Sequence, residues 1–92
     1  MIVRIAGEGQ FRMPSSVLDE LNDIDDRIVA AVAHEDAEGF QRELSSMLGE
    51  VRAKGQPLRD DELMDSELVL PYADLTMDEA KHIFVGDGLI SN

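Results

Sequence analysis

Two histidines, His34 and His82, are the side chains of this sequence best suited to proton transfer or metal binding near neutral pH. They lie far apart in the sequence, and the chain has no cysteine that could join either of them in a zinc site. His34 falls between two predicted helices and His82 on the outward side of a third, so exposure to solvent is the simpler explanation for both. We therefore expect neither a metal site nor a cofactor.

Hydroxyl groups that could act as nucleophiles are present, but no pattern activates them. None lies in a strained elbow motif or in a recognisable arrangement with a histidine: Ser15, Ser16, Ser45, Ser46, Ser66, Tyr72, Thr76 and Ser91. The turn Gly7-Glu8-Gly9 is too short for a dinucleotide-binding loop and does not open a helix. We expect no catalytic residues and no enzyme. A small hydrolase whose site the sequence does not reveal is the weakest of three functional interpretations; the other two are described below.

Acidic side chains gather in two places that could attract a cation. Asp23, Asp25 and Asp26 resemble part of a calcium loop, but no glycine follows at the turn position and the stretch is helical, which excludes an EF-hand. Residues 58–65, the acidic loop, contain four carboxylates that could bind a cation weakly: Asp60, Asp61, Glu62 and Asp65. A solvated loop is the simpler explanation. A small-ligand or cation-binding regulatory domain that uses this loop is the alternative function.

Charge limits the partners of the chain. Its 20 acidic residues outnumber 8 basic ones, so the formal net charge is −12 over 92 residues. Such a surface repels nucleic acids and anionic bilayers, because both bind through cationic patches. No apolar run is long enough to span a membrane, and the first residues do not form a signal peptide. We expect a soluble cytoplasmic protein that neither binds nucleic acid nor inserts directly into a membrane.

A β-hairpin is predicted at the N-terminus. Apolar residues alternate on both sides of Gly7-Glu8-Gly9, as they do in strands joined by a tight turn. We expect a three-residue loop with Gly9 left-handed, because a slip of one residue would move every side chain to the other face. This register pairs Ile5 with Phe11, Val3 with Met13 and Arg4 with Arg12.

Arg4 and Arg12 form the only basic cluster that this register places on the acidic surface. Like charges directly across a ladder are unfavourable unless a carboxylate or another anion lies over them. Carboxylates of the same chain are the simpler source of an anion over the two arginines. The alternative is a carboxylate-rich helix of another protein, which makes both arginines candidate partner-binding residues.

Two amphipathic helices joined by a short connection follow the hairpin. In residues 15–35 the apolar positions recur every three or four residues: Val17, Leu21, Ile24, Ile28, Ala31 and Val32. Ser15 or Ser16 is the expected N-cap. Asp36 is expected to cap a second helix, which Gly55 ends and whose apolar stripe is Ala37, Phe40, Leu44, Met47, Leu48 and Val51. So short a connection favours an antiparallel helical hairpin.

The C-terminal third is predicted to add one strand and one helix. Residues 67–70 form a short β-like run closed by Pro71, which we expect to be a third strand at the edge of the hairpin. Thr76 and Glu79 form a capping box that starts a helix over residues 77–85. The apolar residues near its end exceed what one short helix buries inward: Ile83, Val85, Leu89 and Ile90. Burial in the core is the simpler explanation for them, and binding to a partner is the alternative.

These elements predict an α+β fold in a single domain of residues 1–92. An N-terminal β-hairpin and a short third strand pack against an antiparallel helical hairpin and a short C-terminal helix. With 43% hydrophobic residues the chain can form an ordinary core, so the acid excess lies on its surface. Composition and pattern alone do not indicate what the protein does.

Four segments that span nearly the whole chain are distinctive in their order: MIVRIAGEGQF, VLDELNDIDD, SELVLPYADLTMDEAKHIF and GDGLI. Together they resemble the PspA-associated (PspAA) domain of the phage-shock-protein envelope-stress system. The resemblance implies a non-catalytic protein-interaction module, an adaptor or regulator of a PspA-type coiled-coil protein in the membrane stress response. The partner would then recruit the chain to the inner face of the membrane. The resemblance carries over no catalytic residues and leaves the oligomeric state open.

The acid excess predicts that stability depends on salt. A net charge of −12 with only two lysines, Lys54 and Lys81, suits life in molar salt, where the Debye length falls to about 3 Å. We expect the thermal midpoint to rise from low salt to molar KCl, because screening removes repulsion among the carboxylates. Scanning calorimetry across this range checks the expectation, and a midpoint that stays flat or falls would remove the halophilic interpretation.

Overall fold

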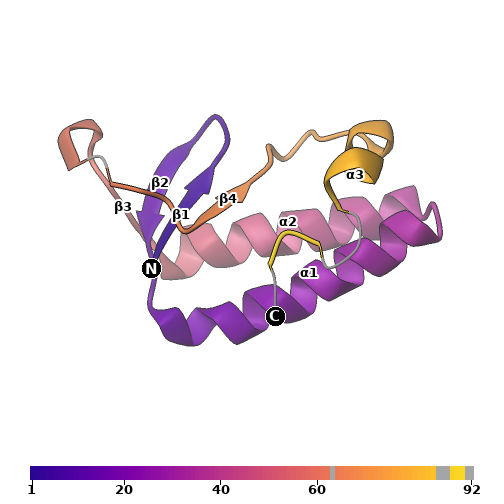
Figure 1. Ribbon diagram of the computed structural model, residues 1–92, viewed down its shortest axis with the longest axis horizontal. Helices are drawn as coiled ribbons and strands as arrows, with labels where there is room; N and C mark the ends of the chain where they lie inside the picture. Colours follow the sequence, from indigo (N-terminus) through magenta and orange to yellow (C-terminus); the bar gives the residue numbers. More distant parts are fainter. Residues whose placement is uncertain (63, 85–87, 91–92) are drawn as a thin grey trace.

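A computed structural model describes residues 1–62, 64–84 and 88–90. Figure 1 shows a small β-sheet and a short C-terminal helix that lie on the same side of two long helices. The described strands are β1 (Ile2–Ile5), β2 (Gly9–Arg12), β3 (Gln56–Pro57) and β4 (Leu68–Leu70). The described helices are the 3-10 turns η1 (Ser15–Val17) and η2 (Asp60–Glu62) and the α-helices α1 (Leu18–Ala33), α2 (Ala37–Lys54) and α3 (Met77–Ile83). The predicted α+β architecture is confirmed.

The sheet has the strand order β3-β2-β1-β4. β1 pairs antiparallel with β2 and parallel with β4, so the expected third strand is confirmed at the edge of the hairpin. The sequence did not predict β3, which has two residues and pairs with β2 directly after α2. The chain turns from α2 into β3 at Gly55, where a Cβ would lie 2.6 Å from the carbonyl oxygen of Val51. Only glycine fits there without displacing the backbone.

The hairpin pairs in a different register from the predicted one. The observed partners are Ile2 with Arg12, Val3 with Phe11, Arg4 with Gln10 and Ile5 with Gly9. The prediction that Arg4 lies directly opposite Arg12 is therefore wrong. The slip amounts to two residues, so each side chain stays on its predicted face, because faces alternate with a period of two.

The position of the loop explains this slip. The loop has three residues, as predicted, but they are residues 6–8 rather than residues 7–9. The Glu8 N–H donates to the Ile5 carbonyl oxygen at 2.9 Å, and Gly7 takes the positive φ of 82° that such a turn requires. Gly9 also has a positive φ, of 112°, but it belongs to β2.

Two predicted helix caps are confirmed. At the start of α2, Asp36 Oδ1 accepts the Gly39 N–H at 3.0 Å, and Gly55 follows the last residue of this helix. At the start of α3, Thr76 and Glu79 form the reciprocal bonds of a capping box. These caps depend on residues three positions apart, which is why the sequence alone could predict them.

The predicted serine cap of α1 is wrong. Ser15–Val17 form a 3-10 turn, in which the Val17 N–H donates to the Pro14 carbonyl oxygen at 3.1 Å. No described side chain caps the first turn of α1. The 3-10 turn thus provides part of the hydrogen bonding that a side-chain cap would give to the first backbone N–H groups.

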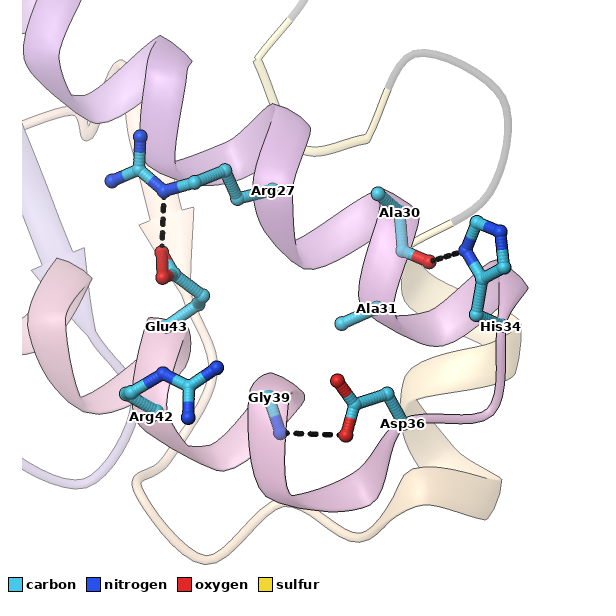
Figure 2. Close-up of a pocket in the computed structure, with 8 residues that line it drawn as sticks. All are labelled: Arg27, Ala30, Ala31, His34, Asp36, Gly39, Arg42 and Glu43. Carbon is cyan, nitrogen blue, oxygen red and sulfur yellow. Dashed lines mark hydrogen bonds and ion pairs between the residues drawn. The ribbon is translucent and has the colours of Figure 1, made fainter.

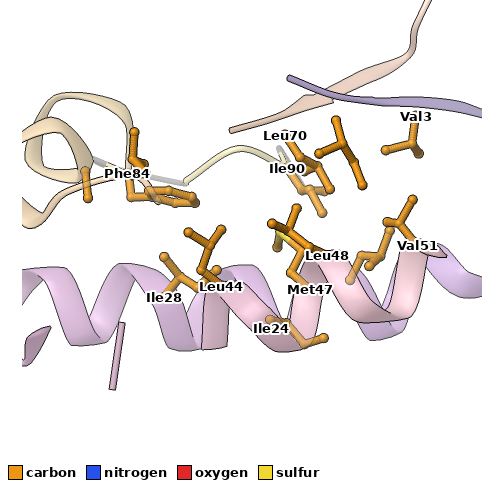
Figure 3. Packing of buried hydrophobic residues seen from close by; sticks show 14 of the residues in the cluster. Val3, Ile24, Ile28, Leu44, Met47, Leu48, Val51, Leu70, Phe84 and Ile90 are labelled. Carbon is orange, nitrogen blue, oxygen red and sulfur yellow. The ribbon is translucent and has the colours of Figure 1, made fainter. Parts of the chain in front are cut away.

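The core lies between the helical hairpin and the layer formed by the sheet and α3. It comprises Val3, Ile5, Met13, Val17, Leu21, Ile24, Ile28, Val32, Phe40, Leu44, Met47, Leu48, Val51, Leu70, Leu75, Ala80, Phe84 and Ile90. Figure 3 shows Phe84, Ile90 and Leu70 on the same side of the two helices. The rings of Phe40 and Phe84 meet edge to face, with centroids 6.0 Å apart. Of the predicted stripes, Ala31 is only half-buried and Ala37 is exposed.

The buried stripes predict the cost of truncating their side chains. Ile28 and Leu44 are 0% exposed. Ile28→Ala or Leu44→Ala should lower the free energy of unfolding by about 2–5 kcal/mol, because transfer energy is lost and a cavity remains. Leu18→Ala is the matched control at a residue that is 38% exposed. Urea denaturation measures all three variants, and losses below about 0.5 kcal/mol for both core variants would show that the stripes do not pack on each other.

Candidate functional site

The histidines lie apart and at the surface. His34 and His82 are both exposed, and His34 Nδ1 lies 2.8 Å from the carbonyl oxygen of Ala30 at the end of α1. In the part of the chain that the structure describes, no three histidine or carboxylate side chains come together in a way that could hold a metal ion. The histidines thus do not mark a shared site.

The acidic loop carries a cation of its own. Arg59 Nε lies 3.4 Å from Asp61 Oδ1 and 3.3 Å from Glu62 Oε1. All three side chains are exposed, so these ion pairs stabilise the loop only weakly. They also neutralise part of the charge that a bound cation would need, and the alternative function therefore gains no support from these contacts.

A shallow pocket lies between the C-terminal half of α1 and the N-terminal half of α2 (Figure 2). It has a volume of about 310 Å³ and is lined by Arg27, Ala30, Ala31, His34, Asp36, Gly39, Arg42 and Glu43. Arg27 Nε lies 2.7 Å from Glu43 Oε2, and Asp36 caps α2. These contacts join the two helices and fix the turn between them, so most charges of the pocket have a structural role.

Arg4 and Arg12 lie on the outer face of the sheet, which points away from the helices. Arg4 is paired with Gln10 in β2 and with Val69 in β4, while Arg12 is paired with Ile2. The two arginines are therefore diagonal neighbours on one face, a relation in which residues are about 7–8 Å apart. We call this pair the arginine face.

Neither residue of the arginine face forms an ion pair with a described carboxylate. Five of the eight basic residues do: Arg27, Arg52, Lys54, Arg59 and Lys81. Arg12 instead donates a guanidinium N–H toward Met64 Sδ at 3.5 Å. The intramolecular pairing that the sequence offered as the simpler explanation is not present among the described residues.

Residues 64–66 cover another part of the same outer face. Gln10 is 6% exposed, and its amide donates to Ser66 Oγ at 2.8 Å and to the Met64 carbonyl oxygen. Its Oε1 accepts the Met64 N–H at 3.2 Å. This cover leaves Arg12 exposed and Arg4 half-buried. Sequence reasoning missed the role of Gln10, because a polar residue in a hairpin strand ordinarily faces solvent.

An apolar groove, the β4 groove, runs beside β4. It has a volume of about 330 Å³ and is lined by Ala6, Val69, Leu70, Pro71, Tyr72, Leu75, Glu79, Ile83 and Leu89. Val69, Tyr72 and Ile83 are three of the five large apolar side chains that are exposed in the described part of the chain. Because Val69 is the register partner of Arg4, the β4 groove adjoins the arginine face.

The structure separates the C-terminal apolar candidates. Ile83 is 38% exposed and lines the β4 groove, and Leu89 is half-buried at the same groove. Ile90 is 7% exposed and belongs to the core, so it is not accessible to a partner in this conformation. Val85 lies outside the described residues.

A buried carboxylate holds residues 88–90, the C-terminal strap. Asp25 is 0% exposed and accepts the N–H of Leu89 at 3.1 Å and that of Ile90 at 2.8 Å. Gly88 packs on the same carboxylate with a φ of 78°, and a Cβ at this residue would lie 2.7 Å from Asp25 Oδ2. One side chain of α1 thus fixes the position of the strap.

Asp25 is an exception to the expectation that the acidic residues lie on the surface. Asp25 lies four residues after Leu21 and three before Ile28, and this spacing is the signal that could have placed it on the buried stripe. Burial raises the pKa of Asp25 above its usual value of 3.8, because the ionised carboxylate loses hydration. The two backbone N–H donors act in the opposite direction.

Comparison with known proteins decides the family. A family model described as PspA-Associated protein matches residues 1–92, which is the whole chain. The chain belongs to the PspAA family. The resemblance inferred from the sequence is therefore confirmed, whereas no curated protein and no solved structure matches. Among the described helices of this PspAA protein, none is long and apolar enough to cross a membrane.

Two segments that carry the PspAA resemblance meet in the structure. Asp25 belongs to the segment VLDELNDIDD, and the strap belongs to the closing segment GDGLI. Their contact joins residues 65 positions apart in the sequence. In this PspAA protein, the order of the segments thus reflects a packing contact as well as a succession of elements.

The contact between Asp25 and the strap predicts the effect of an amide at this position. Asp25→Asn keeps the size of the side chain but replaces one acceptor oxygen by an NH2 group. One buried N–H then lacks an acceptor, which should lower the free energy of unfolding by roughly 1–3 kcal/mol. Asp26→Asn, at an exposed neighbour, is the control. If urea denaturation finds both variants as stable as the parent, the strap does not depend on the carboxylate.

The same contact predicts a dependence on pH. Because the pKa of Asp25 is raised in the folded protein, its contribution to stability is fully present below 3.8 and is lost as the pH rises through the folded pKa. The stability of the parent minus that of Asp25→Asn should therefore grow as the pH falls from about 7 toward about 4. Carboxylates with a lowered pKa, such as Glu8 bonded to Arg52, are present in both the parent and the variant, so their contributions cancel in this difference. A difference that stays constant with pH would contradict this assignment.

Proposed function

We propose that this PspAA protein is a non-catalytic adaptor or regulator that binds a PspA-type coiled-coil protein in the membrane stress response. The observation that carries the proposal is the arginine face, where Arg4 and Arg12 lack a described carboxylate partner although the chain has a net charge of −12. The family description, PspA-Associated protein, supports the choice of partner. The adaptor works in the cytoplasm, and its partner recruits it to the inner face of the membrane.

The spacing of the two arginines suits an acidic helix. Residues four apart rise about 6 Å along an α-helix, and diagonal neighbours on a sheet face are about 7–8 Å apart. Two carboxylates at positions i and i+4 can therefore each meet one guanidinium group. The planar N–H donors of arginine bind a carboxylate through two bonds, which fixes the orientation of the contact. PspA-type proteins are charge-rich coiled coils, so the family resemblance implies a helix of this kind.

Apolar surface beside the arginines adds to this contact. Val69 is 54% exposed and is the register partner of Arg4, so an apolar side chain of the bound helix would cover it. Burial of apolar area contributes roughly 25 cal/mol per Å² and is not weakened by salt screening. The charges then determine the orientation of the helix, and the apolar contact contributes to affinity.

The rest of the surface disfavours other binding modes. The net charge of −12 disfavours an acidic partner over the surface in general, whereas Arg4 and Arg12 attract one. Association should therefore be specific in orientation and should weaken as salt increases, because exposed charge contacts are screened.

Reversing the charge of the arginine face tests the proposal. The double variant Arg4→Glu/Arg12→Glu should bind the coiled-coil PspA homologue from the same cell at least about tenfold more weakly, which corresponds to about 1.4 kcal/mol. The salt dependence of binding should change as well. Arg42→Glu is the matched control, because Arg42 is an exposed arginine of α2 that also lacks an ion pair with a described carboxylate. Titration calorimetry measures binding, and circular dichroism verifies the fold.

Two outcomes would change the assignment. If the double variant is folded and binds as the parent does, the arginine face is not the interface. If it unfolds, the arginines have partners within the chain, and Ile83 and Leu89 at the β4 groove become the better candidate surface.

A further inference from the structure

The two edges of the sheet are protected differently. β3, at one edge, has two residues and ends in Pro57, which has no N–H to donate. β4, at the other edge, consists of three apolar residues, Leu68–Leu70; Pro71 follows it directly, but Val69 at its centre is 54% exposed. Proteins usually protect a sheet edge with such devices, because unpaired strands attract other chains. In the part of the chain that the structure describes, the edge at β4 is therefore open to another strand at Val69.

Val69 presents its backbone to this open edge. The Ala6 N–H donates to the Leu70 carbonyl oxygen at 2.9 Å, so the polar backbone groups of Leu70 face β1. These groups alternate in direction along a strand, so the N–H and C=O of Val69 point away from β1. A strand placed beside β4 would find one donor and one acceptor there.

The β4 groove lies along the same edge and can receive side chains of an added strand. Tyr72, Ile83 and Leu89 line it together with Val69. In an extended segment, alternate side chains point to opposite faces. Apolar residues at every second position would enter the groove, while the residues between them would lie on the side of Arg4.

We infer that the open edge of β4 binds an extended segment of the partner by β-strand addition. The segment has apolar residues at alternate positions and a carboxylate at a position between them. The carboxylate follows from Arg4, the register partner of Val69, which has no ion pair with a described carboxylate; the added strand would fill this position in place of a helix carboxylate. A second copy of this chain suits the edge less well, because it would bring another net charge of −12 against the first. The inference rests on the proposed function only for the identity of the partner.

Amide hydrogen exchange at Val69 tests the inference on the parent protein. NMR measures the exchange rate of this N–H in three samples: the free protein, the protein with the coiled-coil PspA homologue, and the protein with a synthetic peptide of alternating glutamate and valine. The N–H points away from β1 in the free protein and would bond to a carbonyl group in the complex. Exchange should therefore slow by at least about tenfold in the complex.

Two substitutions at Val69 separate backbone from side chain. Val69→Pro removes the outward N–H and should weaken binding of the PspA homologue at least about tenfold. Val69→Thr keeps the N–H and the branched shape but loses part of the apolar contact, so it should lose less affinity than Val69→Pro. If Val69→Pro does not fold, the exchange measurement on the parent decides alone.

The outcomes distinguish the open edge from the identity of the partner. Protection of Val69 by the PspA homologue supports both, and protection by the peptide without any binding of the PspA homologue supports the edge but overturns the proposed partner. Binding of the PspA homologue without protection of Val69 overturns the edge, and absence of binding and protection overturns both. Protection that increases with protein concentration, without any ligand, would show a second copy at β4 and overturn the inference.

Discussion

The helical hairpin cannot be stable alone, because α1 and α2 share an apolar stripe along most of their length. α2 has 18 residues and is about 27 Å long, whereas the strands are too short to cover it completely. The sheet therefore covers one end of the stripe, the strap lies over its middle, and α3 covers the other end (Figure 1). Phe84 meets Phe40 at that end, and Ile90 belongs to the same core. Since the sheet uses only one face for this purpose, its outer face stays available for Arg4 and Arg12.

A carboxylate within this stripe solves a problem that apolar side chains cannot. The strap crosses α1 without belonging to a helix or strand, so its backbone N–H groups need acceptors in a place with little water. A buried N–H without an acceptor costs roughly 1–3 kcal/mol. Asp25 supplies both acceptors, and its buried charge is tolerated because these bonds compensate part of the lost hydration. The position of the strap thus depends on a residue from the first third of the chain.

Much of the fold could be predicted, because helix stripes and caps depend on residues three or four positions apart. The hairpin register could not. The glycines on either side of Glu8 allow two loops one position apart, and both keep the apolar residues on one face. The bonds between Gln10 and residues 64–66 favour the observed pairing, and they lie far outside any local pattern. β3 is too short to show a pattern, and the role of Asp25 depends on a strap 65 residues away. The sequence predicted that Arg4 and Arg12 lie together on one face. It gave them the wrong cross-strand partners, because the predicted register of the hairpin was wrong.

The parallel pairing of β1 with β4 has a consequence for the chain during synthesis. The two strands are far apart in the sequence, so β1, β2 and both long helices emerge from the ribosome well before β4 exists. Until then the sheet lacks a strand, and β1, with buried Val3 and Ile5, has an unpaired edge. Such edges promote association between unfinished chains on neighbouring ribosomes. The carboxylates of the helices, already present at this stage, make those chains repel one another.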